Sequence, residues 1–255
     1  MKNLKKLAIA SLAGTVALMP FSSVFADSHG GKDFDPGQVQ SIEEIIHDYL
    51  MENPEVLVEA LQRYQDNQRV AQAEQQQAAI AAFQAELDGG IGAPLIGNPQ
   101  GDVTLIEFFD YRCPYCKVVA PRVQEAVDQD PNLKVYMIEF PILSPQSRDG
   151  ARAALAADKQ GKYEDFHFAL MDRPGNMSQD HIMAIAQEVG LDTDQLAEDM
   201  ESEEIAQAID YNHQVAQRLG IGGTPALIVG DQLAPGAIEL GELQRMIEAA
   251  RSGAS

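Results

Sequence analysis

Two cysteines occur in this chain of 255 residues, and they stand two residues apart in Cys113-Pro114-Tyr115-Cys116. The pair directly follows a run of apolar and β-branched residues, Val103 to Phe109, which predicts a strand that is buried on both faces. Apolar side chains at helical spacing then predict a helix to about Val127. A second strand is predicted over 133–140, so the cysteines lie at the strand-to-helix turn of a βαβ unit.

The start of this helix favours a reactive sulfur at Cys113. If Cys113 is the N-cap, Pro114 takes the first helical position, where its missing N–H costs nothing, and Cys116 lies in the first turn. Unpaired amides and the helix dipole then stabilise a thiolate at Cys113. We therefore predict that Cys113 is the nucleophile and that the more buried Cys116 resolves the mixed disulfide.

Other uses of a Cys-x-x-Cys pair fit the chain less well. A structural disulfide across so short a loop would stabilise the fold only weakly. A structural zinc site needs four ligands, and the sequence holds no second cysteine pair and no close histidine pair. Haem attachment needs a histidine where Lys117 stands. The sequence thus favours a redox role, and neither zinc nor haem is expected at the cysteines.

The N-terminus has the features of a secretory signal peptide. A basic start, MKNLKK, precedes an apolar run that ends in small residues at Val24 and Ala26, which predicts a signal peptide over residues 1–26. No later stretch has the length of a membrane span, so none is expected after cleavage. The formal charge of −21 repels phosphate backbones and anionic lipids, so nucleic acid and membrane surfaces are not expected partners.

Residues 27–88 are predicted to form a helical extension. A helical pattern begins at Ser41 and breaks at Asn53-Pro54, and a second helix runs to about Leu87. The stretch from Gln65 to Gln77 is rich in Gln and Ala and only weakly apolar. It is either a solvated linker or a self-association helix that orders only in an oligomer.

The catalytic domain is predicted over residues 89–255. It contains a helical insertion over about 147–219, a short strand over 226–229, a returning strand near Leu233 and a last helix over about 239–251.

Three features together resemble the DsbA-like branch of the thioredoxin superfamily. They are the stretch Glu107 to Cys116, the loop Gly222-Gly223-Thr224-Pro225 and the helical insertion between them. The export signal and the helical extension are similar to the suppressor-of-copper-sensitivity protein C (ScsC) group. The resemblance implies an α/β thioredoxin fold with an inserted helical subdomain and a helical N-terminal extension.

The resemblance also implies roles for further residues. Glu107 matches a buried acid that takes the proton of the resolving cysteine, although a surface charge on an edge strand is the alternative. Pro225 matches a cis-proline opposite the cysteines, with the backbone of Thr224 exposed to a substrate strand; an ordinary trans turn is the alternative. The expected substrate-binding residues are Thr224, Pro225, Pro114 and Tyr115.

Two positions indicate the direction of the reaction. Tyr115 stands where strongly oxidising DsbA proteins have a histidine. A threonine before the proline, as at Thr224, resembles the isomerase and reductase members of the family. The leading hypothesis is a periplasmic protein disulfide isomerase or reductase that acts on misoxidised exported proteins. A membrane-bound thiol reductase would keep Cys113 reduced, and a homo-oligomer formed through the extension would shield the site. A dithiol oxidase that introduces disulfides is the alternative within this class.

Copper is the remaining alternative. Cleavage after Ala26 would leave Asp27-Ser28-His29, whose four nitrogens suit Cu(II) or Ni(II), so a copper-binding stress protein that uses His29 and the cysteine pair stays open. No other cofactor is expected beside the redox-active disulfide Cys113–Cys116. The other four histidines are interpreted as surface or packing residues: His47, His167, His181 and His213.

Overall fold

The computed structural model describes residues 34–90, 93–173 and 177–253. The predicted signal peptide (1–26) and His29 lie outside these ranges. The chain divides into two units, residues 1–61 and residues 62–255, and each is described by itself.

The first unit contains helix α1 (Pro36–Glu52) and the start of helix α2 (Glu55–Asp88). Asp35 caps α1 by accepting hydrogen bonds from Gly37 N and Gln38 N at 2.8 and 3.0 Å, and the Gln38 side chain bonds back to Asp35 N at 3.0 Å. This capping box and the proline at the first helical position start the helix at Pro36, earlier than the predicted Ser41. No residue of α1 is buried.

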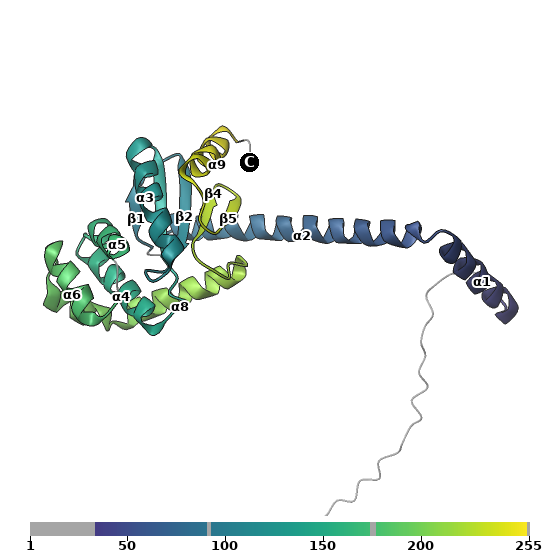
Figure 1. Cartoon of the computed structure of the whole chain (residues 1–255), viewed down its shortest axis with the longest axis horizontal. Helices are drawn as coiled ribbons and strands as arrows, with labels where there is room; N and C mark the ends of the chain where they lie inside the picture. The colour runs from purple at the N-terminus through teal and green to yellow at the C-terminus, as the bar shows by residue number, and fades with distance from the viewer. Residues whose placement is uncertain (1–33, 91–92, 174–176, 254–255) are drawn as a thin grey trace, which may run out of the picture. The chain divides into compact units, whose positions relative to one another are not determined.

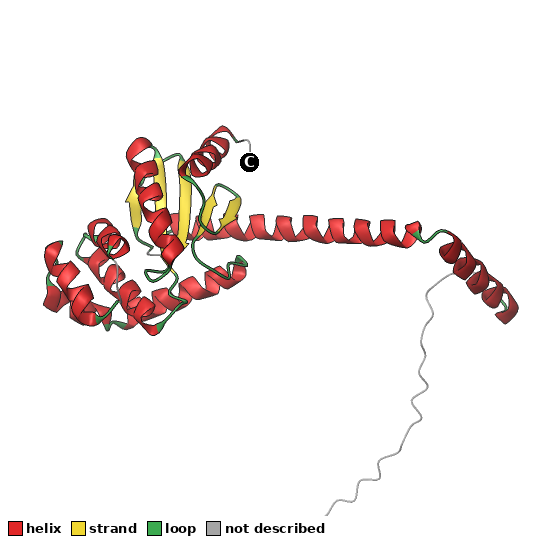
Figure 2. Ribbon diagram, in the orientation of Figure 1, coloured by secondary structure: helices red, strands yellow, loops and turns green. Residues whose placement is uncertain are grey.

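The second unit is built on a five-stranded sheet of order β1-β3-β2-β4-β5 (Figures 1 and 2). Strands β2 and β3 are parallel, and the other neighbouring pairs are antiparallel. The strands are β1 (Leu95–Gly97), β2 (Val103–Phe109), β3 (Leu133–Glu139), β4 (Ala226–Val229) and β5 (Gln232–Pro235). Only β1 was not predicted, because three residues are too few to display an alternating pattern.

The two faces of the sheet carry separate cores, which explains why β2 is apolar along its whole length. On one face, Leu105 and Phe109 pack with the helical insertion and with helices α3 (Pro114–Gln129) and α9 (Leu240–Ser252). On the other face, Ile106 and Phe108 pack with the end of α2 and the end of helix α8 (Glu203–Arg218). A central strand that is covered on both sides has no polar face.

The insertion consists of five helices that follow β3 (Figure 2). They are α4 (Pro145–Lys159), α5 (Tyr163–Asp172), α6 (Gln179–Glu188), α7 (Thr193–Met200) and α8 (Glu203–Arg218). Ser178 and Ser202 cap α6 and α8, and their hydroxyls accept hydrogen bonds from His181 N and Ile205 N, both at 3.4 Å. The predicted helical insertion over about 147–219 therefore corresponds to α4–α8.

The last turns of α2 pack on the catalytic domain, although the sequence analysis placed the whole of α2 in the extension. Ile80, Phe83 and Leu87 are buried against the sheet. Gln84 Nε2 donates to Gly230 O at 2.6 Å, and Asp88 pairs with Lys134 at 2.8 Å. The three apolar residues form a stripe at helical spacing that follows the Gln/Ala-rich stretch, so this end of the helix has a surface to bury.

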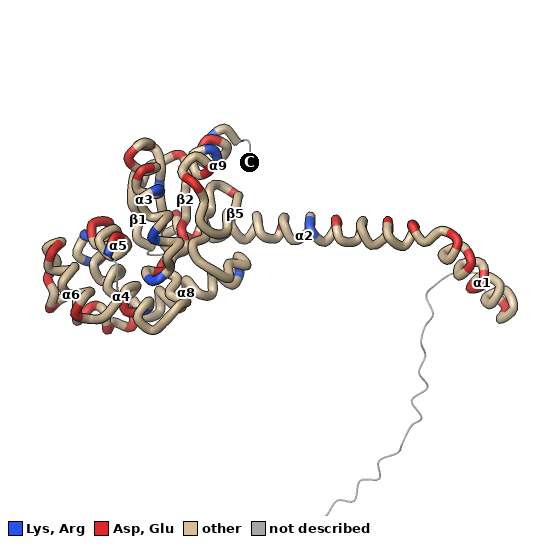
Figure 3. The backbone as a smooth tube through the Cα atoms, viewed as in Figure 1, with Lys and Arg blue, Asp and Glu red and all other residues tan. Residues whose placement is uncertain are grey.

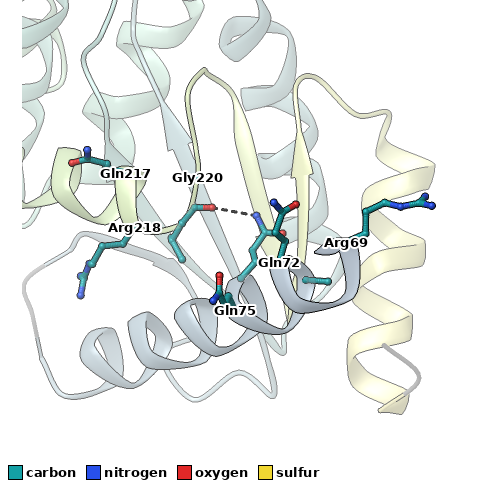
Figure 4. A pocket seen from close by; sticks show the side chains of 9 residues that line it. Arg69, Gln72, Gln75, Gln217, Arg218 and Gly220 are labelled. Carbon is teal, nitrogen blue, oxygen red and sulfur yellow. Dashed lines mark hydrogen bonds between the residues drawn. The ribbon is translucent and has the colours of Figure 1, made fainter. Parts of the chain in front are cut away.

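A groove lies between the middle of α2 and the end of α8 (Figure 4). Gln76 Nε2 donates across it to Leu219 O at 3.2 Å. Its lining contains glutamine, arginine and backbone groups, among them Arg69, Gln72, Gln75, Gln217, Arg218 and Gly220. None of the lining residues carries a thiol or an imidazole, so the redox chemistry lies elsewhere.

Candidate active site

Cys113 occupies the N-cap of α3, as the sequence predicts, with φ −75° and ψ 117° and with Pro114 at the start of the helix. The turn before it is held by Asp110, whose backbone oxygen accepts from Cys113 N at 2.9 Å. The Asp110 carboxylate accepts from Arg112 N at 2.7 Å. Cys113 and Cys116 are free thiols with 5% and 0% exposure. The arrangement places the Cys113 sulfur at the amide-rich end of a helix, with Cys116 beneath the surface.

The loop that ends in Thr224 and Pro225 lies next to Cys113. Because β4 runs antiparallel to β2, with Ala226 opposite Phe108, the loop before β4 and the turn after β2 meet at one end of the sheet. The Thr224–Pro225 peptide bond is cis. Cys113 Sγ donates to Thr224 O at 3.3 Å, so the sulfur and this carbonyl share one small surface.

Glu107 lies on the face of β2 that is covered by α3. It is 1% exposed, and neither carboxyl oxygen has a hydrogen-bond partner. Its strand is central, between β3 and β4, which excludes a surface position on an edge strand. Burial raises the pKa of Glu107 to about 8. Such a carboxyl exchanges a proton near neutral pH.

Cys116 is a poor acid in this environment. Burial raises the pKa of its thiol well above the usual range, and the charges of Glu107 and Cys113 raise it further. The backbone of Asp110 and the Thr224 hydroxyl oppose this increase. Cys116 therefore needs a base to remove its proton before it can attack, and Glu107 is a carboxyl close enough to influence it electrostatically.

An apolar surface surrounds the cysteine turn. Tyr115 is 65% exposed, and Val118, Ile142 and Leu143 are also exposed. Asp110 Oδ2 accepts from Ile142 N and Leu143 N at 2.9 Å each, which holds the loop after β3 beside the turn. This loop was not predicted from the sequence, although the apolar run Pro141 to Leu143 at the end of a strand was a usable signal. Exposed apolar side chains at such a site suit contact with another polypeptide.

The family description "DSBA-like thioredoxin domain" matches residues 104–248, more than half of the chain. The chain belongs to this family. A second description, "Copper resistance protein ScsC N-terminal domain", matches residues 38–80. Family membership confirms the predicted resemblance, the thioredoxin fold and the class of enzyme, a thiol–disulfide oxidoreductase.

Solved structures agree with this assignment. A thioredoxin-like oxidoreductase from Silicibacter pomeroyi DSS-3 is 49% identical, with a TM-score of 0.63, covering 65% of this chain and 96% of that one. Proteus mirabilis ScsC is 25% identical, with a TM-score of 0.64 and coverages of 86% and 98%. A periplasmic thioredoxin-like protein from Salmonella enterica serovar Typhimurium is 29% identical, with a TM-score of 0.58 and coverages of 63% and 90%.

The curated relatives match about three fifths of this chain. Disulfide bond formation protein D of Bacillus subtilis is 25% identical over 172 residues, which are 62% of this chain and 76% of that protein. The Na(+)/H(+) antiporter NhaA 1 of Salinispora arenicola is 26% identical over 159 residues. That match spans only 24% of the antiporter.

A buried polar cluster lies beside the DSBA-like active site and was not found from the sequence. Glu139 Oε1 accepts from the hydroxyls of Tyr111 and Tyr163 at 3.0 Å each, and the Tyr111 hydroxyl lies 2.9 Å from His167 Nδ1. Burial lowers the pKa of His167 to about 3, so its ring is neutral. The available signal was Glu139 itself, an acid that ends a largely apolar strand, as Glu107 is an acid within one.

Lys117 follows Cys116 and ties the active-site helix to the insertion. Its ammonium donates to the carbonyl oxygens of Leu170, Met171 and Arg173 at 3.1, 2.9 and 3.0 Å. These carbonyls belong to the C-terminal end of α5, where a cation is favourable. Burial lowers the pKa of Lys117.

The described part of the chain contains neither a cluster of potential metal ligands nor a candidate membrane span. In residues 34–90, 93–173 and 177–253, no three His, Cys, Asp or Glu side chains are grouped to hold a metal ion. The copper site predicted at His29 lies outside those ranges. His47 is exposed, His181 and His213 are half-buried, and His167 is buried. No helix of the described chain has both the length and the hydropathy to cross a bilayer.

Proposed function

We propose that the protein is a periplasmic protein disulfide isomerase or reductase that acts on misoxidised exported proteins. The observation that carries the proposal is the position of the Cys113 sulfur, at the start of α3 and 3.3 Å from Thr224 O. The sulfur lies at the amide-rich start of a helix, beside a carbonyl that can pair with a substrate chain. The neighbouring Cys116 is buried, and the charge of Glu107 acts on its thiol after the larger effect of burial.

The reaction begins when the Cys113 thiolate attacks one sulfur of a substrate disulfide. A Cys113–substrate disulfide forms, and the other substrate sulfur leaves as a thiolate. In isomerisation, a different substrate thiolate attacks the substrate sulfur that is bonded to Cys113, so a new substrate disulfide forms and Cys113 leaves as a thiolate. In reduction, Cys116 gives its proton to Glu107 and attacks Cys113, so a Cys113–Cys116 disulfide forms and the substrate leaves as a dithiol. A membrane-bound thiol reductase would then return two electrons to the cysteine pair.

Substrate binding is assigned to the surface around Cys113. The backbone of Thr224 pairs with an extended substrate segment, and Pro225 holds that loop against the cysteines. Pro114 and Tyr115 are exposed beside the sulfur and offer apolar contact to the same segment. Because backbone pairing and apolar contact do not depend on particular side chains, this surface can bind misfolded chains of many sequences.

The identity of two residues supports isomerisation or reduction. A histidine at the position of Tyr115 would donate to the Cys113 thiolate and favour the reduced enzyme, making it a stronger oxidant. Tyr115 is 65% exposed, and no hydrogen bond joins it to Cys113. Thr224 precedes the cis-proline and places its carbonyl 3.3 Å from the Cys113 sulfur, and a threonine at this position resembles the isomerase and reductase members.

The extension is assigned to self-association with further copies of this chain. Val39, Ile42, Ile46 and Tyr49 of α1 recur at spacings of three and four residues and are all exposed. A helix with such a stripe is stabilised when the stripes of several copies pack together. Asp and Glu flank the stripe without Lys or Arg in α1, as Figure 3 shows, so salt should favour the association.

Two other functions have specific support. Similarity to disulfide bond formation protein D favours a dithiol oxidase. The match of residues 38–80 to a copper resistance domain favours a link to copper tolerance, and copper binding at His29 belongs to that alternative. An export signal over residues 1–26 is common to all three functions.

Refolding of a substrate with scrambled disulfides tests the proposal. The full chain, with a trace of reductant, should restore the native pairing, and Cys113→Ser should abolish this effect. Trapping of thiols in cells should show the cysteine pair mostly reduced. A pair that is mostly oxidised in cells, together with rapid oxidation of dithiol substrates and no reshuffling, would show a dithiol oxidase instead.

A further inference from the structure

Two carboxyls are buried on one face of the sheet, and only Glu107 has a place in the proposed reaction. We propose that Glu139 is a positioning residue whose negative charge makes Glu107 hold its proton more tightly and so sets the pH at which Cys116 is activated. This inference rests on the proposed role of Glu107 as the base for Cys116.

The strand register brings the two carboxyls together. In the parallel pair β2–β3, Glu107 lies opposite Met137 and Phe109 lies opposite Glu139. Met137 and Phe109 both belong to the core under α3, so Glu107 and Glu139 point to that same face. Adjacent strands and a two-residue offset place their Cα atoms about 8 Å apart. Both side chains are 1% exposed, so little solvent screens their interaction.

The hydrogen-bond partners of the two carboxyls differ. Glu139 Oε1 receives the hydroxyls of Tyr111 and Tyr163, both at 3.0 Å, whereas neither oxygen of Glu107 has a partner. Donors stabilise the ionised form of an acid, and a site without donors favours the neutral form. When the pair holds one proton, the proton therefore lies on Glu107 and the negative charge on Glu139.

The orientation of the cluster agrees with a negative Glu139. The neutral His167 can donate from Nδ1 to the oxygen of Tyr111, which leaves the Tyr111 hydroxyl hydrogen for Glu139. His167 Nε2, which then carries no hydrogen, is buried without a partner. In this series of hydrogen bonds, each donor therefore points toward Glu139.

Other charged and titratable groups face the two carboxyls from neighbouring elements. Burial raises the pKa of both acids, and the negative charges of Asp110 and Glu107 add to this effect on Glu139, while Tyr163 and Tyr111 oppose it. β4 contributes only an apolar residue opposite Glu107, Leu227. The remaining groups are Asp110 and Tyr111 after β2, Cys113, Cys116 and Lys117 at the start of α3, and Tyr163 and His167 on α5.

The charge of Glu139 affects the step in which Cys116 releases the substrate from Cys113. The Cys116 proton passes to the Glu107 carboxylate, the Cys116 sulfur bonds to Cys113, and the bond from Cys113 to the substrate breaks with its electron pair on the leaving sulfur. This step requires Glu107 to be ionised at the start. A negative Glu139 raises the pH at which that happens, so the step is slow in mild acid and accelerates toward neutral and alkaline pH.

The reaction of the reduced full chain with 5,5′-dithiobis(2-nitrobenzoate) separates the two cysteines. In a first phase, Cys113 attacks the reagent and one thionitrobenzoate leaves. In a second phase, Cys116 attacks Cys113 and releases the other thionitrobenzoate. The second phase is independent of reagent concentration, so its pH profile reports the removal of the Cys116 proton.

Glu139→Gln keeps an oxygen for the two tyrosines and removes the charge. We expect the inflection of the second phase to move to lower pH, with a rate at pH 6 about three- to tenfold above that of the wild type. The first phase should not change. Tyr163→Phe removes one of the donors to Glu139 and should shift the profile in the same direction by a smaller amount. Tyr136→Phe removes a tyrosine hydroxyl from the opposite face of β3 and should leave the profile unchanged.

A double variant distinguishes an effect through Glu107 from a general disturbance. In a Glu107→Gln background, Glu139→Gln should cause no further shift. If the profiles of Glu139→Gln and the wild type coincide, or if the shift persists without Glu107, the inference is wrong. A wild-type second phase without any pH inflection, or unaffected by Glu107→Gln, would instead contradict the proposed role of Glu107. If Glu139→Gln does not fold, Tyr163→Phe and Tyr136→Phe decide the matter.

Discussion

Helix α1 and the β2–α3 region achieve definite structure by opposite means. α1 has a complete capping box and a proline at its start, yet none of its residues is buried. β2 is almost wholly buried, and the turn that follows it includes the buried carboxyl of Asp110. Local hydrogen bonds define where α1 begins, whereas packing defines the catalytic region. A segment that depends on local bonds needs a partner to be stable, and a segment that depends on packing can hold a strained or reactive group.

Within α2, the chain changes from exposed residues to residues that are held by packing. A substitution in the packed part tests where this change occurs. Phe83→Ala should lower the free energy of unfolding by about 3–5 kcal/mol, because Phe83 is buried against the sheet. Gln75→Ala, an exposed change on the same helix, should have an effect within about 0.5 kcal/mol. Chemical denaturation of both variants measures this. Equal stability of the two variants would show that residues 76–88 do not stabilise the catalytic domain and belong to the extension, as the sequence predicted.

The buried acid Glu107 should lower the free energy of unfolding of the catalytic region at high pH. The pKa of Glu107 is raised to about 8 in the folded chain, so folding takes up a proton between the usual carboxyl pKa and about pH 8. Stability should fall as pH rises through this window, by at most about 1.4 kcal/mol per pH unit from this group. Glu107→Gln should weaken the dependence and stabilise the protein at pH 8. Thermal melts from pH 5 to pH 9 check the slope, and parallel slopes would argue that Glu107 is ionised in the fold.

The extension should depend on other copies of the chain. Ile46→Asp places a charge in the exposed stripe of α1 and should raise the dissociation constant of the oligomer by at least about tenfold. The melting temperature of the catalytic region should stay the same, because α1 contributes no buried residue. Sedimentation equilibrium gives the association state. Glu43→Gln, a change in the acidic flank, serves as control and should strengthen association slightly. A wild-type protein that sediments as a monomer would contradict self-association through α1.

The smallest effect concerns the cap of α1. Asp35→Ala removes the acceptor of two backbone hydrogen bonds and should destabilise this helix by about 1 kcal/mol. Hydrogen exchange of the amides in the first turn should accelerate about fivefold, while exchange in β2 stays unchanged. Acceleration in both regions would contradict this expectation and show that the cap of α1 also stabilises β2.

Much of the catalytic region could be predicted because its signals are local. The apolar run of β2, the helical spacing after Cys113 and the proline at the first helical position lie within consecutive residues, and the structure confirms these elements. Glu107 was recognised through family resemblance, and its burial was expected from its apolar neighbours. In contrast, β1 contains only three residues, and the end of α2 packs on a sheet whose strands follow it in the sequence.

By itself, the sequence determined the elements around the cysteine pair, the position of Cys113 at the start of a helix and the family of the chain. These depend on backbone geometry and on the order of neighbouring residues, which a linear pattern records. Only the tertiary structure decided that Glu139 shares a face with Glu107 and that Tyr111, Tyr163 and His167 gather around it. Those contacts join residues 24 to 56 positions apart, and long-range packing of that kind leaves no periodic trace in the chain.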